Sequence, residues 1–148
     1  MSDLINKKYG SLILSYYGGD KEVLHIELNE PKKKNALTDE LISEFCEVLR
    51  ELRNSKEIRF LVLSGSGDIF SAGGDRKRML ERSGMFAGDA RDLKHQYQEG
   101  IQQIPLCLES LNIPIIARVT GPAIGAGFDL MCMADFRYAI DSSFFAES

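Results

Sequence analysis

Two glycine-rich segments are the parts of this sequence best suited to chemistry. The first contains Ala72-Gly73-Gly74-Asp75, and the second runs from residue 121 to 127 (GPAIGAG). Because their side chains are absent or minimal, a ligand can approach the backbone of both closely. Each is expected to lead into a helix, where the first backbone N–H groups lack an internal acceptor. Two such groups aimed at one point would hold an oxyanion, although a tight turn or close packing is an alternative explanation of either segment.

Asp129 is the single ionisable residue in the apolar segment that follows the second glycine-rich segment, residues 128–134 (FDLMCMA). A helix that is apolar nearly all round is expected to be buried. A carboxylate in such a helix would be partly desolvated, which raises its pKa and suits it to proton transfer. The alternative, that Asp129 only complements the positive end of the helix dipole, stays open at this point.

The elements that must position these residues follow from periodicity and turn residues. Strands are expected at 10–17, 22–28, 58–63, 114–119 and from about 135, and helices from about 38, over 88–111 and over 128–134. Residues 79–88 look irregular, and Pro105 should kink the long helix or end its first half. A period of two puts His25 on the solvated face of its strand, and His95 lies off the apolar stripe of its helix. This order of elements predicts an α/β fold with crossover connections.

Composition excludes several classes of protein. The chain has 148 residues, of which 44% are hydrophobic, and a formal net charge of −4. This is enough apolar material for one folded domain, so disorder is not expected as the main state. No apolar run approaches the roughly 18 residues that a membrane-spanning helix needs, and the N-terminus lacks a secretory pattern. The acidic balance argues against general nucleic-acid binding.

The cysteines and histidines predict neither a disulfide framework nor a metal site. Cys46, Cys107 and Cys132 form no CxxC pair and fall within apolar helical patterns, so they are expected to be reduced, buried thiols. The two histidines have no ligand-like spacing to any cysteine. We therefore expect no bound metal, and a cytoplasmic location.

Taken together, the motifs resemble those of the crotonase superfamily, also called the enoyl-CoA hydratase/isomerase family. The matching blocks are 29–37 (NEPKKKNAL), 70–75 (FSAGGD) and 114–130 (PIIARVTGPAIGAGFDL), followed by Ala134-Asp135. They occur in the family's order and at compatible separations over nearly the whole chain. The resemblance implies a spiral of ββα units, with residues 1–148 forming a core that binds an acyl-CoA thioester.

The resemblance also implies roles for individual residues. In the family, two backbone N–H groups bind the thioester oxygen and stabilise an enolate, and by motif these donors are Gly74 and Ala126. Loss of one such donor typically costs about 10²–10³ in rate. Residues implied to border the coenzyme A part of the substrate are Lys34, Ala36, Ala72, Gly73, Asp75, Arg76, Lys77 and Gly125. The basic run 76–78 would contact its phosphates, or would form only a solvated helix face. No cofactor is implied beyond the coenzyme A of the substrate.

Of the two catalytic acids that the resemblance implies, this sequence contains the first and stops before the position of the second. Asp129 stands where the family's hydratases carry their first catalytic glutamate and its dienoyl-CoA isomerases an aspartate. By alignment, the second acid needed for hydration would be the residue just beyond Ser148, and Glu147 is offset from that position by two. Family members are considerably longer, and their further part supplies helices that cover the acyl pocket and build a trimer, often paired into a hexamer. We therefore expect a longer natural chain, of which this one lacks the C-terminal helical portion.

The function expected from these residues is that of an enoyl-CoA hydratase or isomerase in which Asp129 shuttles a proton beside an enolate. The expected partner is an acyl-CoA thioester, without nucleic acid or membrane, and the full-length chain is expected to form a homotrimer or hexamer. A non-catalytic acyl-CoA-binding or assembly protein on the same scaffold is the alternative. Hydrolase or decarboxylase chemistry also stays open, because a fold does not set the reaction. Nicotinamide binding fits less well, because the second segment does not match GxGxxG.

Overall fold

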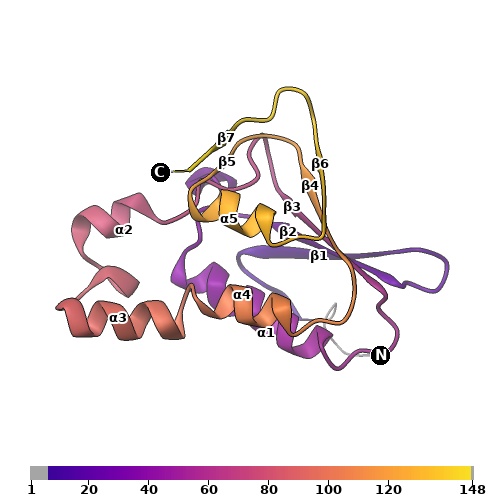
Figure 1. Ribbon diagram of the computed structural model, residues 1–148, viewed down its shortest axis with the longest axis horizontal. Coiled ribbons are helices and arrows are strands. Elements are labelled where there is room, and N and C mark those ends of the chain that lie inside the picture. Colours follow the sequence, from indigo (N-terminus) through magenta and orange to yellow (C-terminus); the bar gives the residue numbers. More distant parts are fainter. Residues whose placement is uncertain (1–6, 148) are drawn as a thin grey trace.

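A five-stranded sheet forms the body of the molecule (Figure 1). The computed structural model describes residues 7–147. The strand order is β1-β2-β3-β4-β6, in which β1 is antiparallel to β2 and the other neighbours are parallel. These strands are β1 (Leu12–Tyr17), β2 (Val23–Leu28), β3 (Phe60–Gly65), β4 (Ile115–Val119) and β6 (Phe136–Ala139). A second, parallel sheet pairs β5 (Ala123–Ile124) with β7 (Phe145–Ala146).

Helices connect the parallel strands, as predicted for an α/β fold with crossover connections. They are α1 (Asp39–Leu52), α2 (Arg76–Glu81), α3 (Ala90–Glu99), α4 (Gln103–Glu109) and α5 (Ala126–Cys132), with short 3-10 helices η2 (Pro31–Lys33) and η3 (Gly84–Phe86). In Figure 1, α2 and α3 extend away from the sheet, whereas α1 and α4 lie side by side beneath it. Helices α2 to α4 all fall between β3 and β4, so they belong to one crossover, and α2 directly follows the first glycine-rich segment.

Helix α1 begins where the sequence predicts a helix, and it buries one apolar face. The Thr38 hydroxyl oxygen accepts a hydrogen bond from the Leu41 N–H at 3.2 Å, which caps the helix. The apolar residues at helical spacing along α1 are buried throughout: Leu41, Ile42, Phe45, Val48, Leu49 and Leu52. It belongs to one hydrophobic cluster with the inner face of the sheet, which includes Leu24, Ile26, Leu28, Leu61, Leu63, Ala117 and Val119. The helix start that borders the site is therefore fixed to the core.

The long helix predicted over 88–111 is two helices, and Pro105 does not break it. The interruption is at Gly100, whose φ of −107° and ψ of −109° lie outside the helical region and end α3. Pro105 lies in the first turn of α4, where a backbone N–H has no acceptor within the helix and proline is tolerated. The segment 79–88 is also more regular than predicted, because its first residues belong to α2 and residues 84–86 form η3.

His25 is buried, contrary to the prediction of a solvated side chain. Its side chain lies on the predicted face of β2, but only 5% of the residue is exposed. Its Nε2 atom is 2.7 Å from the Ser64 hydroxyl oxygen of β3, and its ring lies 5.9 Å from the ring of Tyr17. Burial lowers the pKa of His25. Periodicity gave the face of the strand, whereas the side chains of the two neighbouring strands decided that this part of the face is covered. His95, by contrast, is exposed as predicted.

Helix α5 is not buried all round, which corrects two predictions. Asp129 and Cys132 are exposed, although Cys46 and Cys107 are buried as expected. Only one face of α5 packs on the described part of the chain, through Gly127, Leu130 and Met131. All four residues of β6 beyond it are exposed as well. Within residues 7–147, no helix is long and apolar enough to cross a bilayer, and no cluster of three or more His, Cys, Asp or Glu side chains could hold a metal ion.

Candidate active site

The two glycine-rich segments lie against each other although some 50 residues separate them in the chain. The Ile124 N–H donates a hydrogen bond to the Ser71 carbonyl oxygen at 3.0 Å. A Cβ atom on Gly73, whose φ is +81°, would lie 2.5 Å from the Ile124 carbonyl oxygen. A Cβ atom on Gly127 would likewise lie 2.5 Å from the Ser71 carbonyl oxygen. These two glycines are therefore required for the close approach of the two backbones.

This approach brings the predicted donors, Gly74 and Ala126, near each other. A Cβ atom on Gly73 would be 3.0 Å from the Ala126 nitrogen, and the Gly74 nitrogen is bonded to the Gly73 carbonyl carbon. Standard bond lengths then place the two nitrogens within about 7 Å of each other. In residues 7–147, neither N–H donates a hydrogen bond to the protein. Two backbone donors are thus close together and available to a ligand.

Two buried polar side chains that the sequence did not single out support the first segment. Asn35, which is fully buried, donates through Nδ2 to the carbonyl oxygens of Ser66 and Ile69 at 2.9 and 3.0 Å. The Ser71 hydroxyl donates to the Asn35 carbonyl oxygen at 2.7 Å and accepts from the Gly73 N–H at 3.1 Å. The one available signal for Asn35 is its residue type, because asparagine tolerates the left-handed φ of 50° found there.

A cavity of about 590 Å³ opens beside Gly74. Six of its twelve lining residues are Lys or Arg, so the surroundings of the cavity are cationic although the whole chain carries a net charge of −4. The lining residues are Lys32, Lys33, Lys34, Ala36, Ala72, Gly74, Asp75, Arg76, Lys77, Arg78, Glu81 and Ser83. Of the residues predicted to border coenzyme A, Gly73 and Gly125 are not among them. A cavity of this composition suits a phosphorylated ligand.

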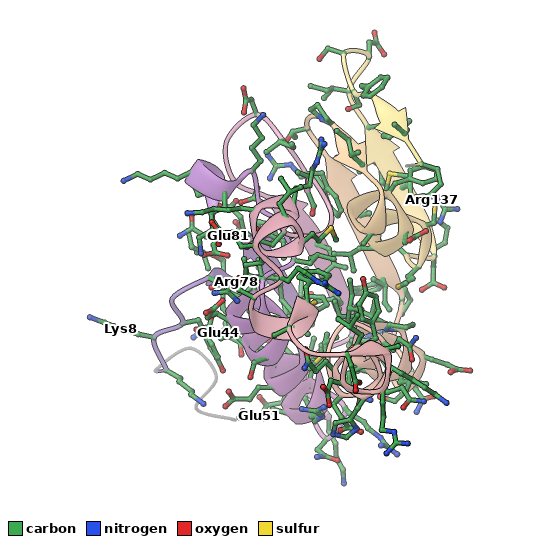
Figure 2. The ribbon with its side chains drawn as sticks, turned by 90° about the vertical axis from the view of Figure 1, so that its left-hand side faces the viewer. Lys8, Glu44, Glu51, Arg78, Glu81 and Arg137 are labelled. Atoms are coloured by element: carbon green, nitrogen blue, oxygen red, sulfur yellow. The ribbon has the colours of Figure 1, made fainter. Side chains whose placement is uncertain are left out.

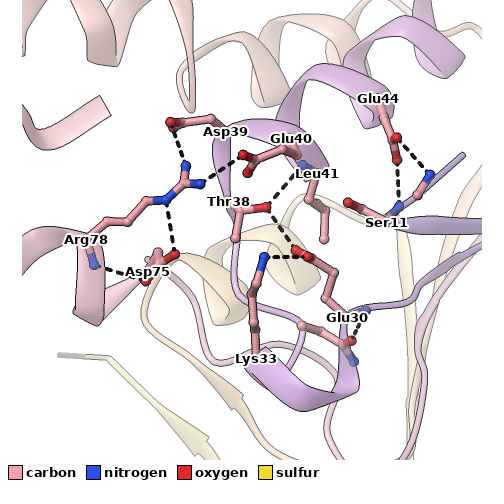
Figure 3. A network of polar contacts seen from close by, with 12 residues as sticks. Ser11, Glu30, Lys33, Thr38, Asp39, Glu40, Leu41, Glu44, Asp75 and Arg78 are labelled. Carbon is pink, nitrogen blue, oxygen red and sulfur yellow. Dashed lines mark hydrogen bonds and ion pairs between the residues drawn. The ribbon is translucent and has the colours of Figure 1, made fainter. Parts of the chain in front are cut away.

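Arg78 is the cavity cation with the most carboxylate partners (Figure 3). Its Nη1 and Nη2 atoms each lie 2.8 Å from a carboxylate oxygen, of Asp39 and of Glu40 respectively. Its Nε atom lies 3.7 Å from Asp75 Oδ2. The hydrogen bond between Glu40 and Arg78 lowers the pKa of the glutamate and raises that of the arginine. Figure 2 shows Arg78 on the same side of the molecule as Glu44 of α1, and Arg137 of β6 on the other side.

The other five cations divide into paired and unpaired side chains. Lys33 Nζ lies 2.7 Å from Glu30 Oε1, which raises the pKa of the lysine, and Lys77 lies 3.9 Å from Glu81. Within the described part of the chain, the side chains without an ion pair are those of Lys32, Lys34 and Arg76. All three are exposed at the cavity and can meet an anion without breaking an internal contact.

Asp129 lies one helical turn from the second donor. It is three residues after Ala126 in α5, and side chains three apart on a helix share a face. Its exposure means that the predicted desolvation is absent in residues 7–147, because no described segment packs over this face of α5. Glu147, the other acid considered, is also exposed.

The mostly parallel sheet, its crossover helices and the two adjoining glycine-rich segments allow a comparison of this chain with known families. Residues 18–148 match the family described as enoyl-CoA hydratase/isomerase. The chain therefore belongs to this family, the crotonases, and its α/β fold matches theirs over about half of their length.

Individual relatives agree with this assignment. The mitochondrial Delta(3,5)-Delta(2,4)-dienoyl-CoA isomerase of Homo sapiens is 35% identical over 133 residues, which cover 84% of this chain and 39% of that protein. The crystal structure of an enoyl-CoA hydratase from Mycobacterium smegmatis superimposes with a TM-score of 0.80 at 29% identity, covering 92% of this chain and 50% of that one. An enoyl-CoA hydratase from Bacillus anthracis superimposes with a TM-score of 0.76 at 26% identity. That match covers 91% of this chain and 49% of the hydratase. This chain thus spans half or less of the length of these relatives.

Proposed function

We propose that this chain binds an acyl-CoA thioester and acts as an enoyl-CoA hydratase or isomerase. The observation that carries the proposal is the pair of backbone N–H groups of Gly74 and Ala126, close together and without an acceptor in the described residues. Gly74 also lines the cationic cavity. A thioester whose carbonyl oxygen accepts from both N–H groups could leave its coenzyme A phosphates among the unpaired lysines and arginine of that cavity.

In the proposed mechanism the two N–H groups stabilise the charge that develops on the thioester oxygen. For isomerisation, Asp129 removes a proton from a carbon of the acyl chain, and the electron pair of that C–H bond shifts toward the carbonyl group to form an enolate. The proton then returns to a different carbon and the double bond shifts, so one carboxylate is sufficient. For hydration, water adds to the β-carbon and a proton to the α-carbon, which calls for a second acid–base group. The described residues therefore support isomerisation better, because hydration needs one more acid–base group.

The position of Asp129 supports its role more than its surroundings do. One helical turn separates Asp129 from the Ala126 donor. This separation suits a base that acts on a carbon next to the thioester carbonyl group. Its exposure leaves its carboxylate hydrated. A bound acyl chain would itself exclude water from this face of α5, and such desolvation favours proton transfer.

The test is turnover of a panel of enoyl-CoA and dienoyl-CoA thioesters by the natural full-length protein. Asp129→Asn keeps the size of the side chain and removes its basicity, so we expect a loss of kcat of about 10²–10⁴ with little change in coenzyme A affinity. Asp141→Asn, a change of another exposed aspartate, is the matched control and should leave kcat unaltered. An Asp129→Asn variant with normal turnover would exclude Asp129 as the proton shuttle.

The exposed Asp129 favours one alternative, a non-catalytic acyl-CoA-binding or assembly protein on the same scaffold. Calorimetry that finds coenzyme A affinity but no turnover of any thioester would support this alternative against the enzyme. The homotrimer or hexamer and the cytoplasmic location both stay predictions. For comparison with the predicted location, the name of the human relative includes "mitochondrial". Sedimentation of the full-length protein and its localisation in cells test these two predictions.

A further inference from the structure

Arg78 lines the cationic cavity, but its charge is already paired with carboxylates of the protein. Three carboxylates surround its guanidinium group, two of them from the first turn of α1 at 2.8 Å and one from Asp75. Only 26% of its side chain is exposed. A guanidinium group has five N–H donors in one plane, and here each of its three nitrogens faces an acceptor. Arg78 is therefore poorly placed to neutralise a ligand phosphate, in contrast to Arg76.

The same contacts lead from Arg78 directly to the proposed donor Gly74. Asp75 follows Gly74 and caps α2, because its Oδ1 atom accepts the Arg78 N–H at 3.1 Å. Its other carboxylate oxygen faces Arg78 Nε. The peptide group of Gly74 is thus followed by a residue whose side chain is held by both the backbone and the side chain of Arg78.

On its N-terminal side, Gly74 is joined to the start of α1. The Gly73 carbonyl oxygen accepts the Leu37 N–H at 2.7 Å, and Leu37 pairs with Gly74 in a parallel bridge. Leu37 immediately precedes Thr38, the N-cap of α1. The contacts form a closed ring that runs from Gly74 through Asp75 and Arg78 to the first turn of α1, and back through Leu37. Figure 3 shows the part of this ring in which Arg78 joins Asp75 to Asp39 and Glu40.

An arginine is required to close this ring. Asp39, Glu40 and Asp75 place three carboxylates around one point, and they would repel one another without a cation between them. The planar fork of a guanidinium group can hold two of them at hydrogen-bonding distance at once, whereas a lysine ammonium is a single point charge. Asp39 Oδ2 also accepts the Met85 N–H at 3.3 Å, which joins η3 to the same centre.

We infer that Arg78 is a positioning residue that holds the Gly74 N–H in place for the thioester oxygen, by tying Asp75 to the first turn of α1. The inference rests on the proposed function, because it is the thioester oxygen that Gly74 would bind. It distinguishes Arg78 from the three unpaired cavity cations. Lys32, Lys34 and Arg76 meet the coenzyme A phosphates, and Arg78 maintains the shape of the site.

Kinetics and binding of the full-length protein separate a positioning role from a phosphate contact. For Arg78→Met we expect kcat to fall about 10- to 100-fold, as for a misplaced reacting group, while the ratio of affinities for coenzyme A and dephospho-coenzyme A stays within a factor of about two. Arg78→Lys, which keeps the charge but not the fork, should lose nearly as much kcat. Arg76→Met should instead weaken coenzyme A binding. Lys94→Met, an exposed change on α3, is the control that leaves all of these values unaltered.

The opposite result overturns the inference. If Arg78→Met left kcat unchanged and selectively weakened binding of the 3′-phosphorylated coenzyme A, Arg78 would be a phosphate ligand. Asp39→Asn provides a second, milder variant in case Arg78→Met does not fold. It should also lower kcat, with a loss that is not additive with that of Arg78→Met. A phosphate-binding Arg78 would instead bind coenzyme A more tightly once the competing carboxylate is gone.

A measurement without ligand distinguishes failure of this inference from failure of the proposed function. The N–H order parameter of Gly74, measured by NMR relaxation, should be about 0.85 in the wild-type protein and fall toward 0.6 in Arg78→Met. A fall in a protein that turns over no thioester would leave the positioning role intact and remove the proposed reaction. An unchanged order parameter and an unchanged kcat in an active protein would remove the positioning role alone.

Discussion

At the scale of single residues, the proposed binding of the thioester oxygen depends on backbone N–H groups, so ordinary side-chain substitutions do not test that part of the mechanism. Ala126 offers an exception because it is the first residue of α5. Proline is well tolerated at this position, since the N–H there has no acceptor within the helix. A proline at this position would remove the N–H and put its Cδ atom where the hydrogen was.

Ala126→Pro should therefore lower kcat/KM by at least about 10² while the protein stays folded. Steady-state kinetics with the best thioester substrate, together with a thermal melt, measure both effects. Ala126→Ser keeps the N–H and serves as the control. Equal activity of the two variants would show that this N–H does not bind the thioester oxygen.

His25 gives the folded protein a dependence on pH at mildly acidic values. Burial lowers its pKa below the ordinary value of 6.5. As the pH falls through 6.5, the unfolded chain therefore takes up a proton that the folded protein resists, and stability is lost until the lowered folded-state pKa is reached. Above pH 6.5 the contribution of His25 to stability is complete.

Between pH 7.5 and 5.5 we expect the free energy of unfolding to decrease by up to about 1.4 kcal/mol for each pH unit that lies between the two pKa values of His25. Urea denaturation at the two pH values measures this decrease. His25→Gln should reduce it, whereas His95→Gln, at an exposed histidine, should leave it unchanged. The same decrease in both variants would mean that other groups cause it.

At the scale of elements, the start of α1 holds two walls of the cavity together. Thr38 is buried, and its hydroxyl accepts from the Leu41 N–H and donates to Glu30 Oε2 at 2.9 Å. Glu30 in turn binds Lys33 of η2. The next two residues of α1 bind Arg78 of α2. The N-terminal turn of α1 thus joins η2 and α2, the two elements that supply five of the six cavity cations.

Thr38→Ala removes the cap and one buried hydrogen bond, so we expect it to destabilise the protein by about 1–2 kcal/mol. Thr38→Ser retains the hydroxyl and should cost much less. The free energies of unfolding in urea check this difference. Similar values for the two variants would assign the effect of Thr38 to its methyl group and its packing.

At the scale of the whole molecule, one side of this chain is apolar and uncovered in the described residues. Large exposed hydrophobic side chains of β6, β7 and the segments beside them include Met133, Phe136, Tyr138, Ile140, Phe144 and Phe145. Strand β6 is also the last strand of the main sheet, with one unpaired edge in residues 7–147. Exposed apolar patches beside a free strand edge promote association.

The 148-residue chain expressed by itself should therefore self-associate at micromolar concentrations. The double substitution Phe136→Lys and Tyr138→Lys should reduce this association, because it places charges on the free edge strand. Sedimentation velocity measures the change. A matched double substitution on exposed α3, His95→Lys and Gln98→Lys, should have no such effect. A monomeric wild-type chain would contradict the prediction.

The sequence by itself determined the elements whose signals are local. The period of two in β2, the turn residues between strands and the start of α1 are all predicted from residues that lie close together in the sequence. The two glycine-rich segments were also recognisable, because glycine there meets a steric requirement that no other residue can. These signals, with the family motifs, were enough for the fold and for the location of the candidate site.

Only the tertiary structure decided which of these residues are covered and what they contact. Asp129 is exposed and His25 is buried, each the reverse of what its own segment indicates. Arg78 belongs to a basic run in the sequence, but its partners Asp39 and Glu40 come from a helix nearly 40 residues earlier. Periodicity shows which face of an element a side chain lies on. Exposure, ion pairing and the meeting of Gly74 with Ala126 depend on which distant segments pack against that face, and this is a property of the folded chain as a whole.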